Sequence, residues 1–283
     1  MTAPVAIGVA ACAGRMGRAI MAAVAAAPEC RLAGASQYEG HAAVGRDAGS
    51  LAPGLAGGIA VLGDPARMMA DADVVIDFST PSGTAAHLRA ALATGTPLVV
   101  GTTGIDAAGR RALADAGRDI PVLAAPNMST GATLLTELTR RLAGILGEDY
   151  DIEVLGLQHR HKVDAPSGTA LGLARAAATG RGLDPETIGA TPRDGHIGAR
   201  RAGMIGLATV HGGDVPGEHT VIFAGPGERL ELAHRPSSLG VYARGAIRAA
   251  CWLAGQEPGF YGMNDVLGFA QASARTHAST SSA

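Results

Sequence analysis

The first half of the chain alternates short apolar runs with helix-like segments, and this alternation limits the fold more than any other feature. Apolar runs of strand length occur at residues 5–9, 32–35, 73–78, 97–100 and 122–124. Apolar residues at helical spacing occupy residues 20–27, 84–93 and 107–116. Repeated strand–loop–helix units predict an α/β fold with a doubly wound parallel sheet.

The first strand–helix junction contains the small-residue turn typical of dinucleotide-binding folds. Gly14 and Gly17 match the second and third glycines of that fingerprint, whereas Ala11 occupies the first position. The strand before the turn and the helix after it favour dinucleotide binding over the alternative, a tight turn that only packs a helix on a sheet. The predicted cofactor-binding residues of this turn are Ala11, Cys12, Ala13, Gly14, Arg15 and Met16.

Gln37 and Tyr38 stand about twenty residues further on, where such folds often place an acidic residue on the adenosine ribose. Gln37 can hydrogen-bond a ribose hydroxyl and carries no charge that would repel a 2′-phosphate. Arg15 or Arg18 could attract that phosphate. The sequence therefore predicts NADH or NADPH as the cofactor and favours neither.

Polar loops follow two later strands of the same predicted sheet. They contain Gly101, Thr102 and Thr103 and then Ala125, Pro126, Asn127 and Met128. Ligands of such sheets bind outside the carboxyl ends of the strands, so we expect both loops to line the nicotinamide end of the cofactor site. Ordinary turn chemistry is at least as good an explanation of any one loop, but three polar loops in succession after strands, the first at residues 79–82, favour a site.

The pattern changes after residue 129. Helical spacing at residues 133–146 is followed by expected strands at 151–157, 206–210, 219–223 and 229–233, with one clear helix among them. We expect a smaller α+β domain with a mostly antiparallel or mixed sheet that is used for oligomerisation. Residues 180–203 predict a surface excursion, residues 240–254 a further helix, and the tail from Thr276 predicts disorder.

Residues 158–169 read Gln-His-Arg-His-Lys-Val-Asp-Ala-Pro-Ser-Gly-Thr, a concentration of charge in a chain with 17% charged residues. Ser167 is the expected N-cap of the following helix. Cationic side chains beside a helix N-terminus form a good anion receptor, because the dipole and the charges favour the same ligand. A solvated basic loop is the alternative. His159 and His161 lack a third metal ligand, so no metal site is predicted.

Composition narrows the classes of function. A hydrophobic share of 47% and a formal charge of −2 argue against general nucleic-acid or membrane-surface binding. The three cysteines are scattered without a CxxC pair, which predicts neither a disulfide framework nor a zinc site. No apolar run reaches about 18 residues and the start is unlike a signal peptide, so we expect a cytoplasmic protein.

In their order, these motifs resemble those of the bacterial dihydrodipicolinate reductases (4-hydroxy-tetrahydrodipicolinate reductases) of lysine and diaminopimelate biosynthesis. The shared motifs lie at residues 14–18, 77–79, 101–104, 125–129, 159–170, 217–220, 245–250 and 265–267. The resemblance implies a Rossmann-type domain of residues 1–128, completed by residues 240–283. It also implies a substrate-binding domain of residues 129–239, through which family members form homotetramers.

The implied reaction is NAD(P)H-dependent reduction of 4-hydroxy-tetrahydrodipicolinate to tetrahydrodipicolinate. Hydride delivery to a C=N carbon puts negative charge on nitrogen unless a proton arrives, so a positioned acid is needed. The resemblance implies that Lys162 can fill this role, and His159 or a bound water are the alternatives. The two carboxylates need cations and N–H donors, for which the candidates are His159, Lys162, Ser167, Gly168 and Thr169.

Several residues depart from the family pattern. Gln158 occupies the place of the histidine that serves the family as proton donor or acceptor, and an amide cannot exchange a proton at neutral pH. The role of Gln158 is therefore in question. Losing one general acid typically costs about 10²–10⁴ in rate, so activity would be reduced rather than necessarily abolished. The other departures are Ala11, Gln37, Tyr38, Met128 and Leu239. Two alternatives follow: a divergent oxidoreductase acting on another cyclic imine or dihydropyridine dicarboxylate, and a catalytically weak nucleotide-binding protein.

Overall fold

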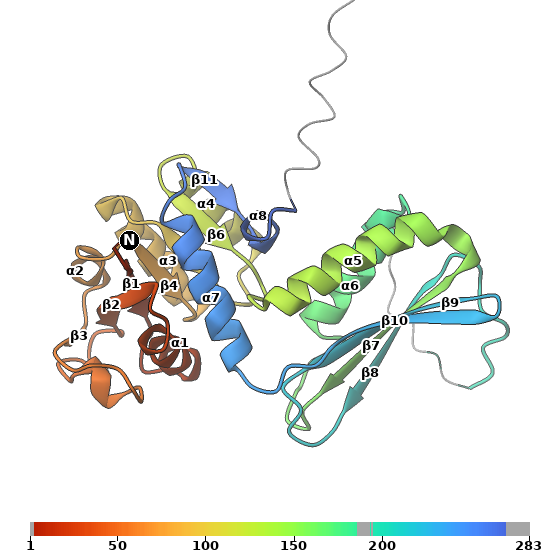
Figure 1. The fold of residues 1–283 in the computed structure, drawn as a ribbon, viewed down its shortest axis with the longest axis horizontal. Helices are drawn as coiled ribbons and strands as arrows, with labels where there is room; N and C mark the ends of the chain where they lie inside the picture. The colour runs from red at the N-terminus through yellow and green to blue at the C-terminus, as the bar shows by residue number, and fades with distance from the viewer. Residues whose placement is uncertain (1–2, 186–192, 194, 270–283) are drawn as a thin grey trace, which may run out of the picture. The chain divides into compact units, whose positions relative to one another are not determined.

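A computed structural model describes residues 3–185, 193 and 195–269 of the chain, so the predicted disordered tail from Thr276 lies outside the described residues. The chain divides into two compact units (Figure 1). The first consists of Met1–Thr130 together with Leu239–Ala283, and the second of Gly131–Ser238.

The first unit is built on a seven-stranded sheet in the order β11-β6-β5-β4-β1-β2-β3, in which every paired strand is parallel. Its strands are β1 Val5–Ala10, β2 Cys30–Ser36, β3 Val61–Leu62, β4 Val74–Asp77, β5 Leu98–Val100, β6 Pro121–Ala124 and β11 Gly259–Tyr261. The chain first builds outwards from β1 through β2 and β3, and then on the other side through β4, β5 and β6. This order confirms the predicted doubly wound sheet.

Helices cover both faces of this sheet. They are α1 Arg15–Ala25, α2 Pro65–Met69, α3 Pro81–Thr94, α4 Ala107–Ala116, α7 Gly240–Leu253 and α8 Met263–Val266. Because successive strand residues point to opposite sides, Ile7 and Val9 pack with α1 and α7, whereas Ala10 joins the cluster of α2, α3 and α4. Burial on both faces explains why the strands are continuous apolar runs.

Local capping sets the helix boundaries. We predicted a helix from residue 84, but α3 begins at Pro81, since proline suits the first helical position and Thr80 accepts a hydrogen bond from the Gly83 N–H. The helix ends at Gly95, whose φ of 70° satisfies the left-handed C-cap. In α4 the Asp106 side chain caps Gly109, and the helix has the predicted bounds.

The second unit contains a four-stranded mixed sheet in the order β10-β9-β7-β8. Its elements are α5 Thr130–Leu146, β7 Asp151–Gln158, α6 Gly168–Gly180, β8 Ile205–His211, β9 Glu218–Gly225 and β10 Glu228–His234. Strand β7 is parallel to β8 and antiparallel to β9, which confirms the predicted mixed sheet. One face of the sheet packs against α5 and α6, with Ile152, Val154 and Phe223 in that core. Residues 181–203, as far as they are described, form no α-helix or strand.

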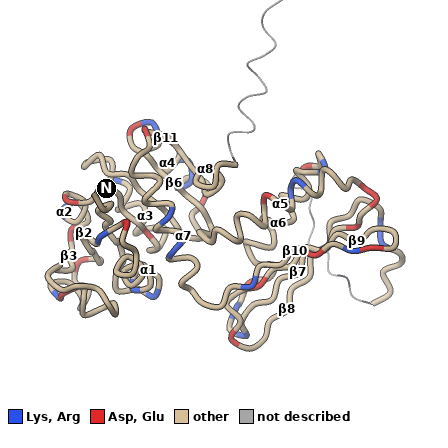
Figure 2. Tube along the Cα trace, in the orientation of Figure 1, with Lys and Arg blue, Asp and Glu red and all other residues tan. Residues whose placement is uncertain are grey.

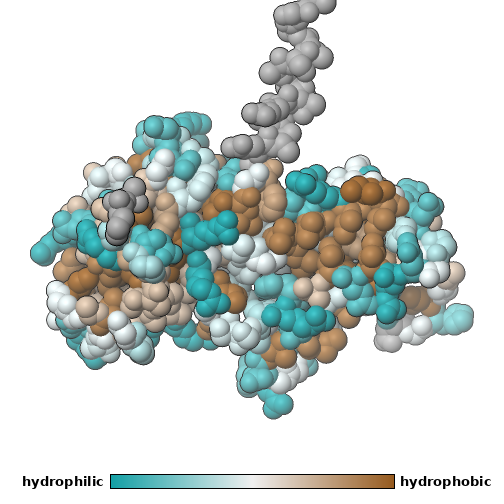
Figure 3. Space-filling model, in the orientation of Figure 1, coloured by the Kyte–Doolittle hydropathy of each residue, from teal (hydrophilic) through white to brown (hydrophobic). Residues whose placement is uncertain are grey.

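The surface of the second unit is partly apolar. Leu134, Leu138 and Ile145 of α5 are exposed, and Figure 3 shows a broad apolar area over this helix. Lys and Arg alternate with Asp and Glu along the trace rather than gathering in one stretch (Figure 2). Within the described ranges, no helix combines the length and apolar character needed to cross a bilayer.

Candidate active site

The turn between β1 and α1 leaves the start of α1 open to a ligand. Gly14 is the N-cap residue in an extended conformation, and no side chain caps the helix. The N–H groups of the first turn have no acceptor within the helix, and the helix dipole favours an anion there. A Cβ on Gly17 would lie 2.5 Å from the Ala11 carbonyl oxygen and 2.6 Å from the Cα of Cys12. Only glycine therefore allows α1 to approach the end of β1 this closely.

Ala11 takes a backbone conformation that glycine adopts more easily. Its φ is 52°, in the left-handed region, which costs an L-residue roughly 1–2 kcal/mol. Hydrogen bonds hold the turn in this form: the Cys12 N–H donates to the Ser36 carbonyl (3.0 Å) and the Gly14 N–H to the Ala11 carbonyl (3.1 Å). The Arg18 Nε donates to the Ala13 carbonyl (2.9 Å). Backbone hydrogen bonds thus close the turn tightly although the first glycine is absent.

Gln37 and Tyr38 follow β2 directly, beside the β1–α1 turn. The Tyr38 N–H donates to Gln37 Oε1 (3.2 Å), so the amide NH₂ of Gln37 is left to meet a ligand. The Tyr38 side chain is 69% exposed and meets the His41 ring edge-on at 5.1 Å. This corner presents a neutral donor and an aromatic surface where an acidic residue is common.

The carboxyl ends of β4, β5 and β6 complete the same edge of the sheet. The ring of Phe78 lies directly against Gly101, whose N–H donates to the Asp77 carbonyl (2.9 Å). Thr102 is buried and accepts a hydrogen bond from the Thr84 hydroxyl (2.8 Å), whereas Thr103 is exposed. The two predicted loops after β5 and β6 are therefore neighbours in space, because these strands pair directly.

The side chains in the β6 loop have mixed environments. The Ala125 N–H donates to the Val100 carbonyl (3.1 Å), Pro126 is exposed, and Asn127 Oδ1 accepts from the Ser129 N–H (2.9 Å). Met128, like Cys12 of the first turn, has its side chain buried in the core cluster with α1 and α7. Of these two residues, only backbone atoms can meet a ligand.

A buried carboxylate that we did not predict as a site residue lies beneath this edge. Asp77 accepts from the Ser79 N–H at 2.9 Å, and its other oxygen lies 3.2 Å from His87 Nδ1 on α3. Burial alone would raise the pKa of Asp77, yet the neighbouring His87, and then Ser79 and Thr84, lower it below its usual value. This pair fixes the loop after β4 to α3.

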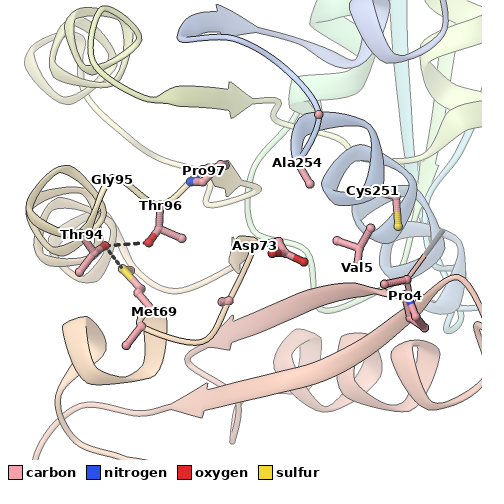
Figure 4. Close-up of a pocket in the computed structure, with 14 residues that line it drawn as sticks. Pro4, Val5, Met69, Asp73, Thr94, Gly95, Thr96, Pro97, Cys251 and Ala254 are labelled. Atoms are coloured by element: carbon pink, nitrogen blue, oxygen red, sulfur yellow. Dashed lines mark hydrogen bonds between the residues drawn. The ribbon is translucent and has the colours of Figure 1, made fainter.

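A cavity of about 650 Å³ opens at the opposite, amino-terminal edge of this sheet (Figure 4). Its polar groups are engaged within the protein: Asp73 accepts from the Ala6 N–H (2.8 Å), and the Thr94 and Thr96 hydroxyls bond each other (2.7 Å). Since doubly wound sheets bind ligands at the carboxyl ends of their strands, this cavity is not the expected cofactor site.

In the second unit, the carboxyl ends of β7, β8 and β10 meet the amino end of β9 at one edge. Gln158 closes β7 opposite His211 of β8, and His219 of β9 lies opposite His234 of β10. Ser167 then caps α6, its hydroxyl accepting from the Ala170 N–H (3.1 Å), as predicted. All the predicted substrate-binding residues lie in the loop between β7 and α6 or at the start of α6: His159, Lys162, Ser167, Gly168 and Thr169.

Lys162 lies in the loop between β7 and α6. Its Nζ donates to Asp164 Oδ1 (2.8 Å); the Lys162 side chain is 20% exposed and that of Asp164 is 63% exposed. The hydrogen bond from Lys162 lowers the pKa of Asp164. The rings of His159 and His161 are tilted, with centroids 6.4 Å apart. Because Asp164 is exposed, a ligand carboxylate can compete for the Lys162 ammonium.

Gln158 points into the protein and meets a histidine. Its side chain is buried, and its Nε2 lies 3.2 Å from His219 Nε2, which is also 2.8 Å from Ser167 Oγ. Burial, and then the charges of His234 and Lys162, lower the pKa of His219 to about 4. The ring is therefore neutral at pH 7. No group of His, Cys, Asp or Glu in the described part of the chain could hold a metal ion.

Together these features define a two-unit protein with a Rossmann-type dinucleotide-binding sheet and a separate mixed sheet that carries a cationic loop. Family models described as dihydrodipicolinate reductase, N-terminus and C-terminus, match residues 5–128 and 131–267. The chain belongs to the dihydrodipicolinate reductase family.

Similar proteins support this placement. The 4-hydroxy-tetrahydrodipicolinate reductase of Magnetococcus marinus is 50% identical, covering 93% of this chain and 98% of that protein. The reductase of the same name from Thiobacillus denitrificans is 48% identical over 93% of this chain and 98% of that protein. The solved structure of dipicolinate-bound dihydrodipicolinate reductase from Paenisporosarcina sp. TG-14 has the same fold, with a TM-score of 0.73, 20% identity, and coverage of 93% of this chain and 99% of that one.

Proposed function

We propose that this protein reduces 4-hydroxy-tetrahydrodipicolinate to tetrahydrodipicolinate with NADH or NADPH, in lysine and diaminopimelate biosynthesis. The observation that carries the proposal is the cationic loop with Lys162, which ends at the capped start of α6. The reductases named above, at 48–50% identity over nearly their whole length, support the same activity.

The first unit fits a pyridine dinucleotide. The uncapped start of α1 and the close approach at Gly17 form the cradle for a pyrophosphate. Gln37 offers an amide donor to the ribose, and its neutrality is compatible with either NADH or NADPH. The proposed place for the nicotinamide end is at the loops of residues 101–103 and 125–128, because ligands of doubly wound sheets bind at the carboxyl ends of the strands. The bound cofactor supplies the hydride for the C=N carbon.

The second unit supplies groups for the two carboxylates. The Lys162 ammonium and the His159 ring offer charge and hydrogen bonds, and the start of α6 offers backbone N–H groups. A Cβ on Gly168 would meet nothing within 4 Å, so a ligand can reach this helix start. The Ser167 hydroxyl already engages Ala170 and His219, so its proposed role is to hold the helix start rather than to bind the substrate.

Lys162 is the proposed proton donor to the nitrogen that receives the new electron pair. Gln158 has no proton to exchange, and His219 is neutral and buried. The Lys162 ammonium can donate a proton, and its partial exposure allows the amine left after transfer to be reprotonated from solvent.

The test is NAD(P)H oxidation with enzymatically generated 4-hydroxy-tetrahydrodipicolinate. We expect saturable turnover that pyridine-2,6-dicarboxylate inhibits competitively. If Lys162 donates the proton, Gln158→His should change kcat by less than about tenfold. This is well short of the 10²–10⁴-fold rate factor that a general acid contributes. A wild type without turnover would overturn the proposal. A rise of about 10²-fold or more in Gln158→His would instead favour the divergent oxidoreductase.

We also propose a homotetramer formed through the sheet of the second unit. The sheet face opposite α5 and α6 carries Leu155, 38% exposed, and Val210, 53% exposed, with Ile222 on the same face. An exposed apolar sheet face of this kind favours association. Light scattering should give four chain masses for the wild type and a smaller mass for Val210→Asp; a monomeric wild type would contradict this.

A cytoplasmic location is also part of the proposal. The unpaired thiols of Cys12, Cys30 and Cys251 support it.

A further inference from the structure

The proposed chemistry leaves a buried polar cluster of the second unit without a role. His219 lies on the helix-covered face of β9 and is 5% exposed. Its Nε2 is within hydrogen-bond distance of both the Gln158 amide nitrogen (3.2 Å) and the Ser167 hydroxyl (2.8 Å). One ring nitrogen therefore joins the end of β7 to the N-cap of α6.

The donors in this cluster can be assigned from chemistry. The Gln158 amide nitrogen can only donate. The Ser167 hydroxyl accepts from the Ala170 N–H (3.1 Å), so its own hydrogen is available for His219. The Nε2 of His219 must then be the acceptor for both groups, with the ring proton on Nδ1. A second proton on Nε2 would face the Gln158 NH₂ donor and remove the acceptor that this group needs.

The cluster anchors both ends of the loop of residues 159–166. Gln158 stands directly before this loop and Ser167 directly after it. Gly217 confines the amide from the other side, since a Cβ there would lie 2.9 Å from Gln158 Oε1. The position of Lys162 relative to the start of α6 therefore depends on a ring that does not itself reach the loop surface.

We propose that His219 is a positioning residue of the reductase, which through Gln158 and Ser167 sets the distance between Lys162 and the start of α6. This inference rests on the proposed function. It also gives Gln158 a role: the amide donates to His219 instead of exchanging a proton.

The test compares His219→Ala, His219→Gln and His219→Asn. The carbonyl oxygen of glutamine can reach the place of Nε2, whereas that of asparagine reaches only the place of Nδ1. We expect His219→Ala and His219→Asn to raise KM for the dicarboxylate about 10–100-fold with KM for the cofactor unchanged, because small displacements of binding groups are costly. In His219→Gln, KM for the dicarboxylate should stay within about threefold of the wild-type value, well below the rise expected for the other two variants.

Titration calorimetry with pyridine-2,6-dicarboxylate measures the same effect without turnover. If wild type binds this probe but does not reduce the substrate, the proposed function fails while the role of His219 is still tested. Equal KM and probe affinity in His219→Asn and wild type would overturn the inference. Thermal melting of each variant separates a misfolded protein from a mispositioned loop. If His219→Ala does not fold, the comparison of KM and probe affinity between His219→Gln and His219→Asn still decides the question.

Acid unfolding gives a second readout. The groups that face His219 are Lys162 from the loop and His234 from β10, with the uncharged Gln158 and Ser167. The pKa of His219 is about 4 in the fold, against 6.5 without it, so between these values only the unfolded chain binds the proton. The free energy of unfolding should fall as the pH is lowered from 6.5 to 4, and more steeply in wild type than in His219→Gln. Equal slopes in urea titrations would contradict a neutral His219.

Discussion

Lys162→Met is expected to lower kcat/KM for 4-hydroxy-tetrahydrodipicolinate by about 10²–10⁴-fold. Methionine keeps much of the length of the side chain but removes both the proton and the charge that would hold a carboxylate. Neither Gln158 nor His219 can replace the lost proton, because Gln158 is an amide and His219 is buried and neutral. Steady-state NAD(P)H oxidation measures the loss, and KM for the cofactor should not change.

Lys162→Arg separates the two roles of the lysine. The guanidinium keeps the positive charge but does not give up its proton in a protein. We expect KM for the dicarboxylate to remain within about tenfold of wild type while kcat stays about 10²-fold or more below it. Asp164→Asn is the matched control, since it removes the partner of Lys162 at 2.8 Å and keeps the ammonium. A kcat of Lys162→Met within tenfold of wild type would exclude Lys162 as the proton donor.

The elements that could be predicted from the sequence are those in which local chemistry and packing agree. The strands of the first sheet are buried on both faces, so each reads as a continuous apolar run. Helix α4 has its predicted bounds because Asp106 caps one end and Gly117 follows the other. We did not predict β3, α2, β11 or α8. They have two to five residues each, too few to show a period, and β11 pairs with β6 from far along the chain.

The residues of the candidate site also fall into those that could be predicted from the sequence and those that could not. Gln158 and Ser167 could be singled out because they lie within one continuous motif, and the N-cap at Ser167 follows from local geometry. His219 could not be assigned to the cluster, because its place is set by the antiparallel register that aligns it with Gly156 of β7. The sequence contains the residue but not the register. Asp77 and His87 meet for a similar reason, across the packing of α3 on β4.

Gly17→Ala is expected to weaken cofactor binding by about 10²-fold and to lower the free energy of unfolding by about 1–3 kcal/mol. The added Cβ would lie 2.5 Å from the Ala11 oxygen and 2.6 Å from the Cys12 Cα, and both atoms belong to the backbone. No rotamer change relieves this overlap, so α1 must move away from β1 and take its open N-terminus with it. Fluorescence titration with NADH and urea denaturation measure the two losses.

Gly14→Ala is the matched control, because it adds the same methyl group in the same turn. Its closest contact would be 3.3 Å, to the Ala11 oxygen, and its φ of −71° suits any residue. Its stability should therefore stay within about 1 kcal/mol of wild type, as for most exposed substitutions. Cofactor affinity can still fall, because the methyl group lies at the helix start where a phosphate would approach. If Gly17→Ala matched Gly14→Ala in stability, the close packing of α1 on β1 would not be what requires glycine at position 17.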